Sequence, residues 1–515
     1  MKIKNPFHRF EPQDFFAAVL SAILLALSFP RADYWFFAWV GLVPLLIVLD
    51  KSSPQKSFQV AYLTGALFFA QTLYWVGHVT IIGACVLVLY CALYFGIFGL
   101  WYAWIKKSSR VPHWALVASG WSALEYLRAN LFSGFSWSSL CLSQYKNLPV
   151  IQITDMVGML GVTFLIVGCN YILKELILCL QSRRCLGAFK KDCCVYALVL
   201  AGVLIYGQWK ILKPLEGESV KIAVIQANIP QENKWDERYW PQIMQRYEEL
   251  SFRAKEQFNP QLFIWPETAF PGIIENSGKD LWPMYSFIDE KLQEDILWGA
   301  IREEAGQYFN SAILVTRDSK NFSYYNKLHL VPYGEYIPLR GLFPFLGEII
   351  PIADFTPGNE FKLFEISPDD GDVKLFYPVL ICFEDTIPQL AKRFADKGAD
   401  FFVNITNDAW FGDSSAPFMH LQSSVFRAVE NRRYVVRAAN TGVSGFINYK
   451  GQMEAMVRDS SGKMTFIEGV AGQEVLANQK KTIYTKIGDV FTLLCFGCIL
   501  WDVRMRKIRI GSKSV

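Results

Sequence analysis

Long apolar stretches separated by short polar loops fill the first 212 residues of the chain. A transmembrane helix needs roughly 17–25 predominantly apolar residues. Seven stretches approach or reach this length, near residues 14–30, 34–50, 58–77, 82–105, 112–127, 154–173 and 193–209. One more lies near 488–503, after a long polar interval. The pattern therefore predicts a polytopic α-helical membrane domain with about eight transmembrane helices.

The long polar interval has a different periodicity, in which short β-branched and aromatic runs alternate with amphipathic stretches. The expected strands are 221–227, 262–265, 296–300, 311–316, 379–382, 401–405, 434–438 and 445–448, and the expected helices are 240–256, 386–397 and 417–431. Such alternation is typical of an α/β sandwich. We therefore expect three segments: seven transmembrane helices in residues 1–212, an α/β domain in 213–486, and the eighth helix with a basic tail in 487–515.

Lysine and arginine are unevenly distributed among the loops, and short cytoplasmic loops are the ones enriched in these residues. With the N-terminus inside, the basic clusters at 2–9, 51–56, 106–110, 183–191 and 504–513 all fall on the cytoplasmic side. The opposite loops hold little more than Arg31, Arg128 and Lys146. An even number of spans returns the basic C-terminus to the cytoplasm. The polar domain is therefore expected on the outer face of the membrane, which in a bacterium is the periplasmic face of the inner membrane.

Composition agrees with a membrane protein and excludes a nucleic-acid-binding one. Hydrophobic residues make up 52% of the chain and charged residues only 19%, a balance that soluble globular proteins rarely have. The formal net charge is +4, and the basic residues are scattered between apolar runs. The basic face expected of a nucleic-acid-binding protein is missing from this pattern.

The cysteines point to one residue of the polar domain. Ten of the eleven lie in or beside the apolar stretches, and the polar domain holds only Cys382. A lone thiol in an oxidising compartment has no disulfide partner within its own domain and is a candidate reactive group. A buried small hydrophobic residue is the alternative interpretation.

Three chemically useful side chains follow expected strands or lie in unusual loops. Glu267 comes directly after Leu-Phe-Ile-Trp-Pro, Cys382 directly after Val-Leu-Ile, and Lys327 lies in a loop rich in aromatic and turn residues. In α/β sheets, chemistry gathers where strands end. A thiol is mostly protonated at neutral pH and needs a base, which Glu267 can supply, while an ammonium such as Lys327 can stabilise a developing oxyanion.

These residues alone leave the identity of the base open. A Cys–His pair is the competing arrangement, for which the domain offers His329 and His420. A glutamate after proline is also often a surface turn, and a loop lysine is often simply exposed. The polar domain has no cysteine pair and no histidine spacing typical of a metal site, so we expect no metal and no cofactor.

Several motifs resemble a known family. Segments 264–268 (Ile-Trp-Pro-Glu-Thr), 325–335 (Tyr-Asn-Lys-Leu-His-Leu-Val-Pro-Tyr-Gly-Glu) and 381–384 (Ile-Cys-Phe-Glu) resemble the Glu–Lys–Cys signature of the nitrilase, or carbon–nitrogen hydrolase, superfamily. Nearly the whole chain is similar to the apolipoprotein N-acyltransferase family within it, through the apolar spans and the segments 125–128, 133–137, 226–235 and 407–412. The resemblance implies an extracytoplasmic nitrilase-like α-β-β-α sandwich.

The resemblance also assigns roles to individual residues. It implies Cys382 as the nucleophile, Glu267 as the general base and Lys327 as the residue beside the oxyanion. Supporting roles are implied for Glu335, Glu384 and Trp235. One position departs from the family: Phe383 stands where members commonly have tyrosine. Phenylalanine lacks the tyrosine hydroxyl, so it cannot make the hydrogen bond that this hydroxyl would make to the substrate or to a loop.

The reaction implied is a ping-pong acyl transfer through a cysteine thioester. A phospholipid, usually phosphatidylethanolamine, would donate its sn-1 acyl chain to the thiol. The α-amine of an S-diacylglyceryl-cysteine at a lipoprotein N-terminus would then accept it, which completes lipoprotein maturation. Both substrates are anchored in the membrane, so the pocket has to lie at the bilayer surface and has to exclude water from the thioester.

Two segments are candidates for contact with lipid or acyl chain. Segment 340–356 is strongly apolar but broken by glycine and proline, so we expect a lid around Pro344, which has a phenylalanine on either side. A loop packed on the domain core is the alternative. In segment 407–412, Trp410 and Phe411 are expected to line the pocket, although a tight turn explains the same residues.

Two other functions are compatible with parts of this pattern. A membrane-tethered nitrilase-like amidase or hydrolase would keep the same three residues and let water resolve the thioester. A transporter or scaffold with an inactive domain would need ionisable residues along a path through the membrane, and these are sparse in the apolar stretches.

Glu125 and Arg128 are ionisable residues of the membrane half, and we expect them to pair with each other on one helix.

Overall fold

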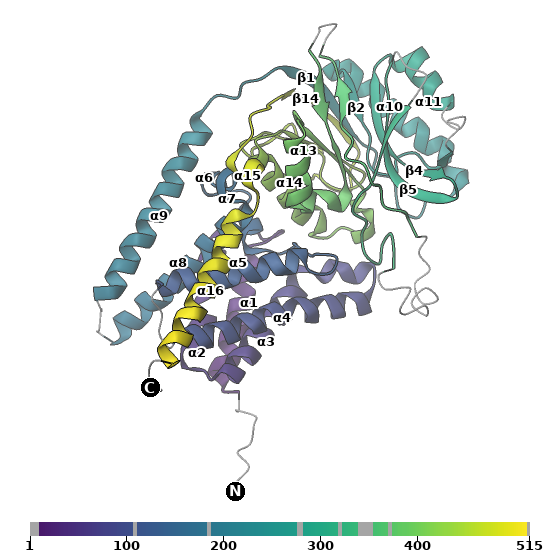
Figure 1. Ribbon diagram of the computed structural model, residues 1–515. Coiled ribbons are helices and arrows are strands. Elements are labelled where there is room, and N and C mark those ends of the chain that lie inside the picture. The colour runs from purple at the N-terminus through teal and green to yellow at the C-terminus, as the bar shows by residue number, and fades with distance from the viewer. Residues whose placement is uncertain are drawn as a thin grey trace. The chain divides into compact units, whose positions relative to one another are not determined.

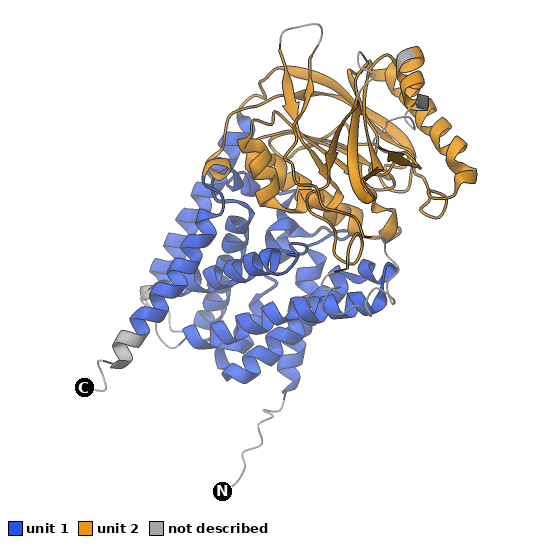
Figure 2. Cartoon of the chain, turned by 45° about the vertical axis from the view of Figure 1, so that its right-hand side comes forward, with its two compact units in different colours: residues 1–212, 487–515 blue, residues 213–486 orange. Residues whose placement is uncertain are grey.

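The computed structural model describes residues 10–106, 111–182, 187–275, 282–317, 322–337, 354–368 and 373–511. The chain forms two compact units, residues 1–212 with 487–515 and residues 213–486, coloured separately in Figure 2. Each unit is described by itself.

The first unit is helical (Figure 1). Its longer helices are α1 (Pro12–Leu27), α2 (Val43–Lys51), α3 (Pro54–Thr72), α4 (Ile81–Ile105), α5 (His113–Asn130), α8 (Met159–Ser182), α9 (Gly187–Leu212) and α16 (Val490–Gly511). Two single-turn helices, α6 (Leu148–Ile151) and α7 (Thr154–Val157), precede α8, and 3-10 turns cover Trp35–Trp39, Tyr74–His78 and Leu140–Gln144.

Among the described residues, three helices are long and apolar enough to cross a membrane: Ile81–Ile105, Met159–Gln181 and Phe189–Leu212. Pro12–Leu27 is apolar but shorter. The prediction of one spanning helix over 34–50 is wrong, because a 3-10 turn and the separate helix α2 occupy this stretch. Pro44 lies in the first turn of α2, where its missing N–H is tolerated. At 1.5 Å per residue α2 is only about 14 Å long, so the predicted count of eight spans is not confirmed.

Several helix ends of the first unit are tied together by their basic residues. Lys56 at the start of α3 forms an ion pair with Asp14 at the start of α1, at 2.7 Å. Lys106 at the end of α4 donates to the carbonyls of Asp50 and Ser52 at the end of α2. Arg506 of α16 donates to the carbonyl of Ile105. These contacts place basic residues from three polar segments at one end of the helical unit.

Glu125 and Arg128 do not pair as the sequence predicted. Glu125 accepts hydrogen bonds from the backbone N–H of Leu140 at 2.9 Å and from Thr163 Oγ1 at 2.7 Å. Arg128 donates to the carbonyl of Trp137 at 2.6 Å. The prediction of mutual pairing is therefore wrong: both side chains instead satisfy the backbone of the irregular 137–140 segment, which has few partners of its own inside an apolar unit.

The second unit is built on two main β-sheets. The larger has the order β14-β1-β2-β4-β5-β6 with β3 paired to β4, and the smaller has the order β13-β12-β11-β10-β9. Strands β7 and β8 form a separate hairpin. The strands are β1 (Ser219–Gln226), β2 (Leu262–Ile264), β3 (Ile273–Glu275), β4 (Asp295–Glu304), β5 (Gln307–Val315), β6 (Phe322–Asn326), β7 (Phe364–Ile366), β8 (Leu375–Tyr377), β9 (Val379–Ile381), β10 (Phe402–Thr406), β11 (Val435–Ala439), β12 (Gly445–Ile447), β13 (Met453–Glu454) and β14 (Gly469–Leu476).

Helices cover the outer faces of these sheets. Helix α10 (Trp240–Phe258) packs on β1 and β14, β1 also packs on β11 of the other sheet, and α14 (Ala416–Asn431) packs on β11 and on α13 (Pro388–Asp396). Two shorter helices are α11 (Trp282–Ser286) and α15 (Ile483–Ile487). The layers are therefore helix, sheet, sheet and helix, the sandwich expected from the sequence. All eight expected strands and all three expected helices are present within a few residues.

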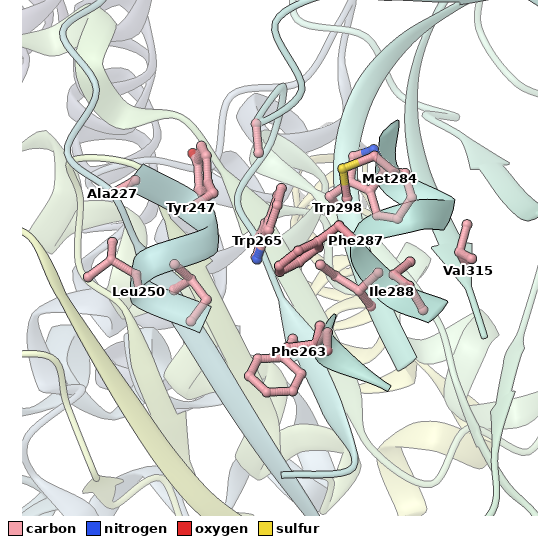
Figure 3. Close-up of a cluster of buried hydrophobic side chains, with 14 of the residues drawn as sticks. Ala227, Tyr247, Leu250, Phe263, Trp265, Met284, Phe287, Ile288, Trp298 and Val315 are labelled. Atoms are coloured by element: carbon pink, nitrogen blue, oxygen red, sulfur yellow. The ribbon is translucent and has the colours of Figure 1, made fainter. Parts of the chain in front are cut away.

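An aromatic cluster fixes the strand that leads to the first candidate residue. Trp265, directly after β2, is fully buried and stacks on Tyr247 of α10 with ring centroids 4.6 Å apart (Figure 3). Its indole N–H donates to Ser251 Oγ at 3.0 Å, and Phe287 packs beside it at 6.2 Å. A buried tryptophan contributes roughly 3–5 kcal/mol to folding. This packing holds the end of β2 in place. It therefore also fixes the position of Glu267, which lies two residues after Trp265.

Candidate active site

Glu267 lies in a tight turn after β2 that depends on a glycine from the neighbouring strand. A Cβ on Gly299 would lie 2.5 Å from the Cα of Glu267, a contact that no side chain can make. The buried carboxylate is oriented at both oxygens. Oε1 accepts from Asn310 Nδ2 at 2.8 Å, and Oε2 accepts from the backbone N–H of Asn407 at 2.9 Å.

Lys327 follows β6 and is almost completely buried. Its ammonium lies 2.9 Å from Glu335 and 3.6 Å from Oε1 of Glu267. Burial alone would lower the pKa of Lys327, but the carboxylates of Glu335 and Glu267 outweigh this effect and raise the pKa above its ordinary value. Lys327 is therefore a fixed positive charge beside Glu267, as stabilisation of an oxyanion requires.

Cys382 begins a 3-10 turn directly after β9, with φ of +51°. A non-glycine residue in this region costs about 1–3 kcal/mol and persists where its surroundings impose it. The Cys382 carbonyl accepts from Asn404 Nδ2 at 3.3 Å and lies 3.1 Å from His420 Nε2. The contacts of Asn404 and His420 with the backbone oxygen of Cys382 thus hold this candidate nucleophile in a strained turn.

The three residues come from two sheets and meet at one place. Burial raises the pKa of the Cys382 thiol well above its ordinary value, the charge of Glu267 raises it further, and Lys327 opposes both. These are the electrostatic effects of close neighbours. Glu267 is therefore the candidate acceptor for the proton of the thiol. This arrangement can perform nucleophilic attack on an ester or amide carbonyl.

Glu384 connects the Cys382 turn to the Lys327 loop. Its carboxylate is fully buried and accepts from the backbone N–H of Ile381 at 2.8 Å, of Leu328 at 2.7 Å and of His329 at 3.1 Å, and from the hydroxyl of Tyr325. Burial raises its pKa to about 7 despite these bonds. Glu384 is therefore a tether between two segments from different sheets.

We expect Glu384→Gln to destabilise the protein by about 3 kcal/mol, because the amide N–H₂ replaces an acceptor that faces N–H donors. Thermal unfolding of the purified protein measures this loss. The matched control is Tyr325→Phe, which removes only the hydroxyl contact to the same carboxylate and should cost about 1 kcal/mol. Equal losses in the two variants would contradict the tether.

The two histidines considered as alternative bases both have partners in or beside the Cys382 turn. His329 stacks on Phe383 with ring centroids 6.1 Å apart. His420 Nδ1 lies 3.0 Å from Asp408 Oδ1, and its Nε2 lies 2.9 Å from Asp385 Oδ1. His420 Nε2 also lies 3.1 Å from the carbonyl oxygen of Cys382. Glu267 stays the candidate base, with Lys327 3.6 Å from its carboxylate.

The aromatic candidates for substrate contact differ in exposure. Trp235 and Trp410 are 44% and 54% exposed, respectively. Phe411 and Phe383 are partly buried. Pro344 and most of the expected lid around it lie outside the described residues. The exposed indoles are unusual for a domain surface and remain candidates for contact with lipid.

Two residues of the site went unnoticed in the sequence. Asn310 donates through one nitrogen to both Glu267 Oε1 and Glu335 Oε1, at 2.8 and 2.6 Å. Lys234 is buried, donates to the Glu267 carbonyl at 3.0 Å, and has its pKa lowered to about 7 by burial. Asn310 resembles any polar residue of a strand, but Lys234 lies within the 226–235 motif and that position was a usable signal. Among the described residues, no group of three His, Cys, Asp or Glu side chains is arranged to hold a metal.

Comparison with known proteins identifies the family. Residues 221–471 match the carbon–nitrogen hydrolase model, and residues 21–172 match the model described as apolipoprotein N-acyltransferase N-terminal domain. An apolipoprotein N-acyltransferase from Geobacter metallireducens is 34% identical over 94% of this chain and 93% of its own length. The chain belongs to the apolipoprotein N-acyltransferase family. The expected resemblance and the nitrilase-like fold of the second unit are confirmed.

Further relatives agree with this membership. A family member from Methylococcus capsulatus is 31% identical over 85% of this chain and 86% of its own length, and one from Pasteurella multocida is 28% identical over 92% of each. Among solved structures, an amidase from Nesterenkonia sp. AN1 is 17% identical and covers 54% of this chain and 97% of its own, with a TM-score of 0.39.

Proposed function

We propose that this protein transfers a fatty acyl chain from a phospholipid to the N-terminal α-amine of S-diacylglyceryl-cysteine in apolipoproteins. Family membership supports the activity, and one observation supports the mechanism. Lys327 lies 3.6 Å from Glu267, and the Glu384 carboxylate joins the backbone N–H groups of Ile381 and Leu328, which are the chain neighbours of Cys382 and Lys327. A base, a nucleophile and a cation are the parts that acyl transfer through a thioester needs.

The first half-reaction loads the enzyme. Glu267 takes the thiol proton while the Cys382 sulfur attacks the sn-1 ester carbonyl of the phospholipid. The negative charge that develops on the carbonyl oxygen is stabilised by the Lys327 ammonium. When the intermediate collapses, the bond to the glycerol oxygen breaks, and Glu267 returns its proton to that oxygen. The products are a thioester on Cys382 and a lysophospholipid. We propose phosphatidylethanolamine as the donor.

The second half-reaction transfers the acyl chain from the enzyme to the lipoprotein. The lipoprotein α-amine attacks the thioester carbonyl and gives a proton to Glu267, an amide bond forms, and the carbon–sulfur bond breaks. Glu267 then returns the proton to the Cys382 thiolate. Glu335 and Asn310 orient the charges throughout, through contacts of 2.9 Å to Lys327 and 2.8 Å to Glu267. One carboxylate acting alternately as base and acid is sufficient for both steps.

We also propose that residues 213–486 form the catalytic domain, on the periplasmic face of the bacterial inner membrane. The covalent connections support this placement, since the domain follows α9 and precedes α16 in the chain. The basic helix ends gathered at one end of the helical unit support a cytoplasmic location for that end. The exposed Trp235 and Trp410 are proposed to contact the lipid or its acyl chain, and Phe411 and Phe383 to line the acyl path. The expected lid around Pro344 lies outside the described residues.

Product identity tests the proposed function. We expect the full-length protein, mixed with phosphatidylethanolamine and a diacylated lipopeptide, to yield the N-acylated lipopeptide and lysophospholipid in equal amounts by mass spectrometry. A lipopeptide with an acetylated α-amine is the matched control, and with it the thioester should accumulate on Cys382. Release of free fatty acid at the same rate with either peptide, without amide product, would identify a hydrolase instead.

A further inference from the structure

Beneath the Cys382 turn lies a group of charged side chains that the proposed mechanism does not use. It consists of His420 from α14, Arg437 from β11, and Asp385 and Asp408 from the turns that follow β9 and β10. Each of the four side chains is at most 1% exposed. Buried charges of this density are expensive unless every member is paired, so their arrangement requires an explanation.

The geometry defines the protonation state of His420. Its Nδ1 lies 3.0 Å from Asp408 Oδ1. Its Nε2 lies 2.9 Å from Asp385 Oδ1 and 3.1 Å from the Cys382 carbonyl oxygen. All three neighbours are acceptors, so both ring nitrogens have to donate. Two aspartates, one arginine and a doubly protonated His420 also sum to zero charge.

The electrostatic balance agrees with this assignment. Burial alone would lower the pKa of His420, but the charge of Asp385, helped by Asp408 and opposed by Arg437, raises it to about 9. The carboxyls of both aspartates have lowered pKa values because His420 and Arg437 outweigh the effect of their burial. A histidine that already carries both protons cannot take another from a thiol.

The four side chains also connect two turns that border the site. Asp385 belongs to the 3-10 turn that begins with Cys382, and Asp408 belongs to the 3-10 turn Asp408–Phe411 that carries Trp410. Arg437 donates to Asp385 Oδ2 at 3.1 Å and to Asn404 Oδ1 at 2.8 Å. Asn404 is the second donor to the Cys382 carbonyl. The strained backbone of Cys382 is therefore held by two donors that belong to one buried network.

We infer that His420 is a positioning residue, which as an imidazolium holds the Cys382 carbonyl and joins the nucleophile turn to the 408–411 turn. The inference rests on the proposed function for its catalytic consequence. The inference also gives the 407–412 motif a structural role, which is to hold the Cys382 turn through Asp408 and His420. Asp408 is the buried residue that holds this motif in place. Position 442 beside it has to be a glycine, because a Cβ on Gly442 would collide with Asp408 Oδ2.

Two substitutions separate the two ends of the imidazole. In His420→Gln the amide nitrogen reaches the position of Nε2 and keeps the bond to the Cys382 carbonyl. In His420→Asn the amide nitrogen reaches only the position of Nδ1 and loses that bond. Displacing a reacting group by about 1 Å costs on the order of 10²-fold in rate. We therefore expect thioester formation from phosphatidylethanolamine vesicles to fall about tenfold in the glutamine variant and about 100-fold in the asparagine variant.

The readouts distinguish positioning from a base or a purely structural role. The loss should appear in kcat and not in KM, and by the same factor between about pH 6 and 8, because no titrating base is removed. Gln422→Ala is the matched control, since it empties a fully buried polar position on the same helix and should leave the rate unchanged. Thermal unfolding shows that each variant is folded. A rate loss that grows with pH, an equal loss in Gln422→Ala, or wild-type rates in both histidine variants would overturn the inference.

A second measurement does not depend on the acyl donor. Alkylation of Cys382 by iodoacetamide, quantified on its own peptide in the full-length protein, should slow in the order wild type, His420→Gln, His420→Asn. If wild type forms no thioester but this order holds, the proposed function fails and the positioning role stands. If wild type forms the thioester and alkylation is the same in all three proteins, the positioning role fails alone.

Discussion

Cys382→Ala is expected to abolish acyl transfer while leaving the protein folded in the membrane. The thiol is the group that carries the acyl chain covalently in the proposed mechanism, so its loss removes both half-reactions and should lower the rate on the order of 10³-fold or more. The Cys382 side chain is small, and the residue is held by Asn404 and His420 through its carbonyl. Alanine keeps that carbonyl, so the turn should persist.

Mass spectrometry of the enzyme after incubation with phospholipid measures this effect. Wild-type protein should gain the mass of one acyl chain on the peptide that contains Cys382, and the alanine variant should gain none. Cys382→Ser should also fail, because a hydroxyl is far less ionised than a thiol beside the same carboxylate. Cys85→Ala, which removes an exposed thiol of α4, should acylate normally. An acyl adduct formed without Cys382 would remove the proposed nucleophile.

Glu267→Gln and Lys327→Met are expected to impair transfer similarly but to move the thiol pKa in opposite directions. Loss of the general base should cost about 10²–10⁴-fold, and loss of the oxyanion charge about 10²–10³-fold. The charge of Glu267 raises the pKa of Cys382 and that of Lys327 lowers it. The glutamine variant should therefore have a lower thiol pKa than wild type, and the methionine variant a higher one.

The rate of Cys382 alkylation as a function of pH measures the two shifts. In Glu267→Gln the midpoint moves down, so the thiol becomes easier to alkylate at a given pH although acyl transfer is lost. In Lys327→Met the midpoint moves up. Shifts of the same sign in both variants would show that the residues act through general damage to the domain and not through their charges.

The sequence predicted the position of the reactive groups because strand ends are visible in it. Glu267 and Cys382 each follow a short run of apolar residues, and such runs form buried strands in both sheets. The strands it did not predict have weaker patterns. β14 contains two glycines, and β13 has only two residues, so their pairing is determined by the neighbouring strand and not by local preference.

The polar contacts within the site were less visible for a different reason. Asn310 and His420 bind partners far away in the sequence, including Glu267 and Asp385, and nothing near either residue marks them as different from other polar residues. The broken helix over 34–50 was missed because hydropathy averages over its glycine and proline. Apolar length predicts a possible span, but the backbone can still interrupt it where a proline starts a new helix.

The division of the site between two sheets has a consequence for biogenesis. Glu267 and Lys327 follow strands of one sheet, and Cys382 follows a strand of the other. Three of the residues that hold the Cys382 turn, namely Asn404, His420 and Arg437, come still later in the chain. A polypeptide made from its N-terminus therefore exposes an ordinary thiol until Arg437 has been synthesised and both sheets have joined. If the domain is exported to the periplasmic face as proposed, its nascent chain passes the lipids of the membrane before it has gained the ability to react with an acyl donor.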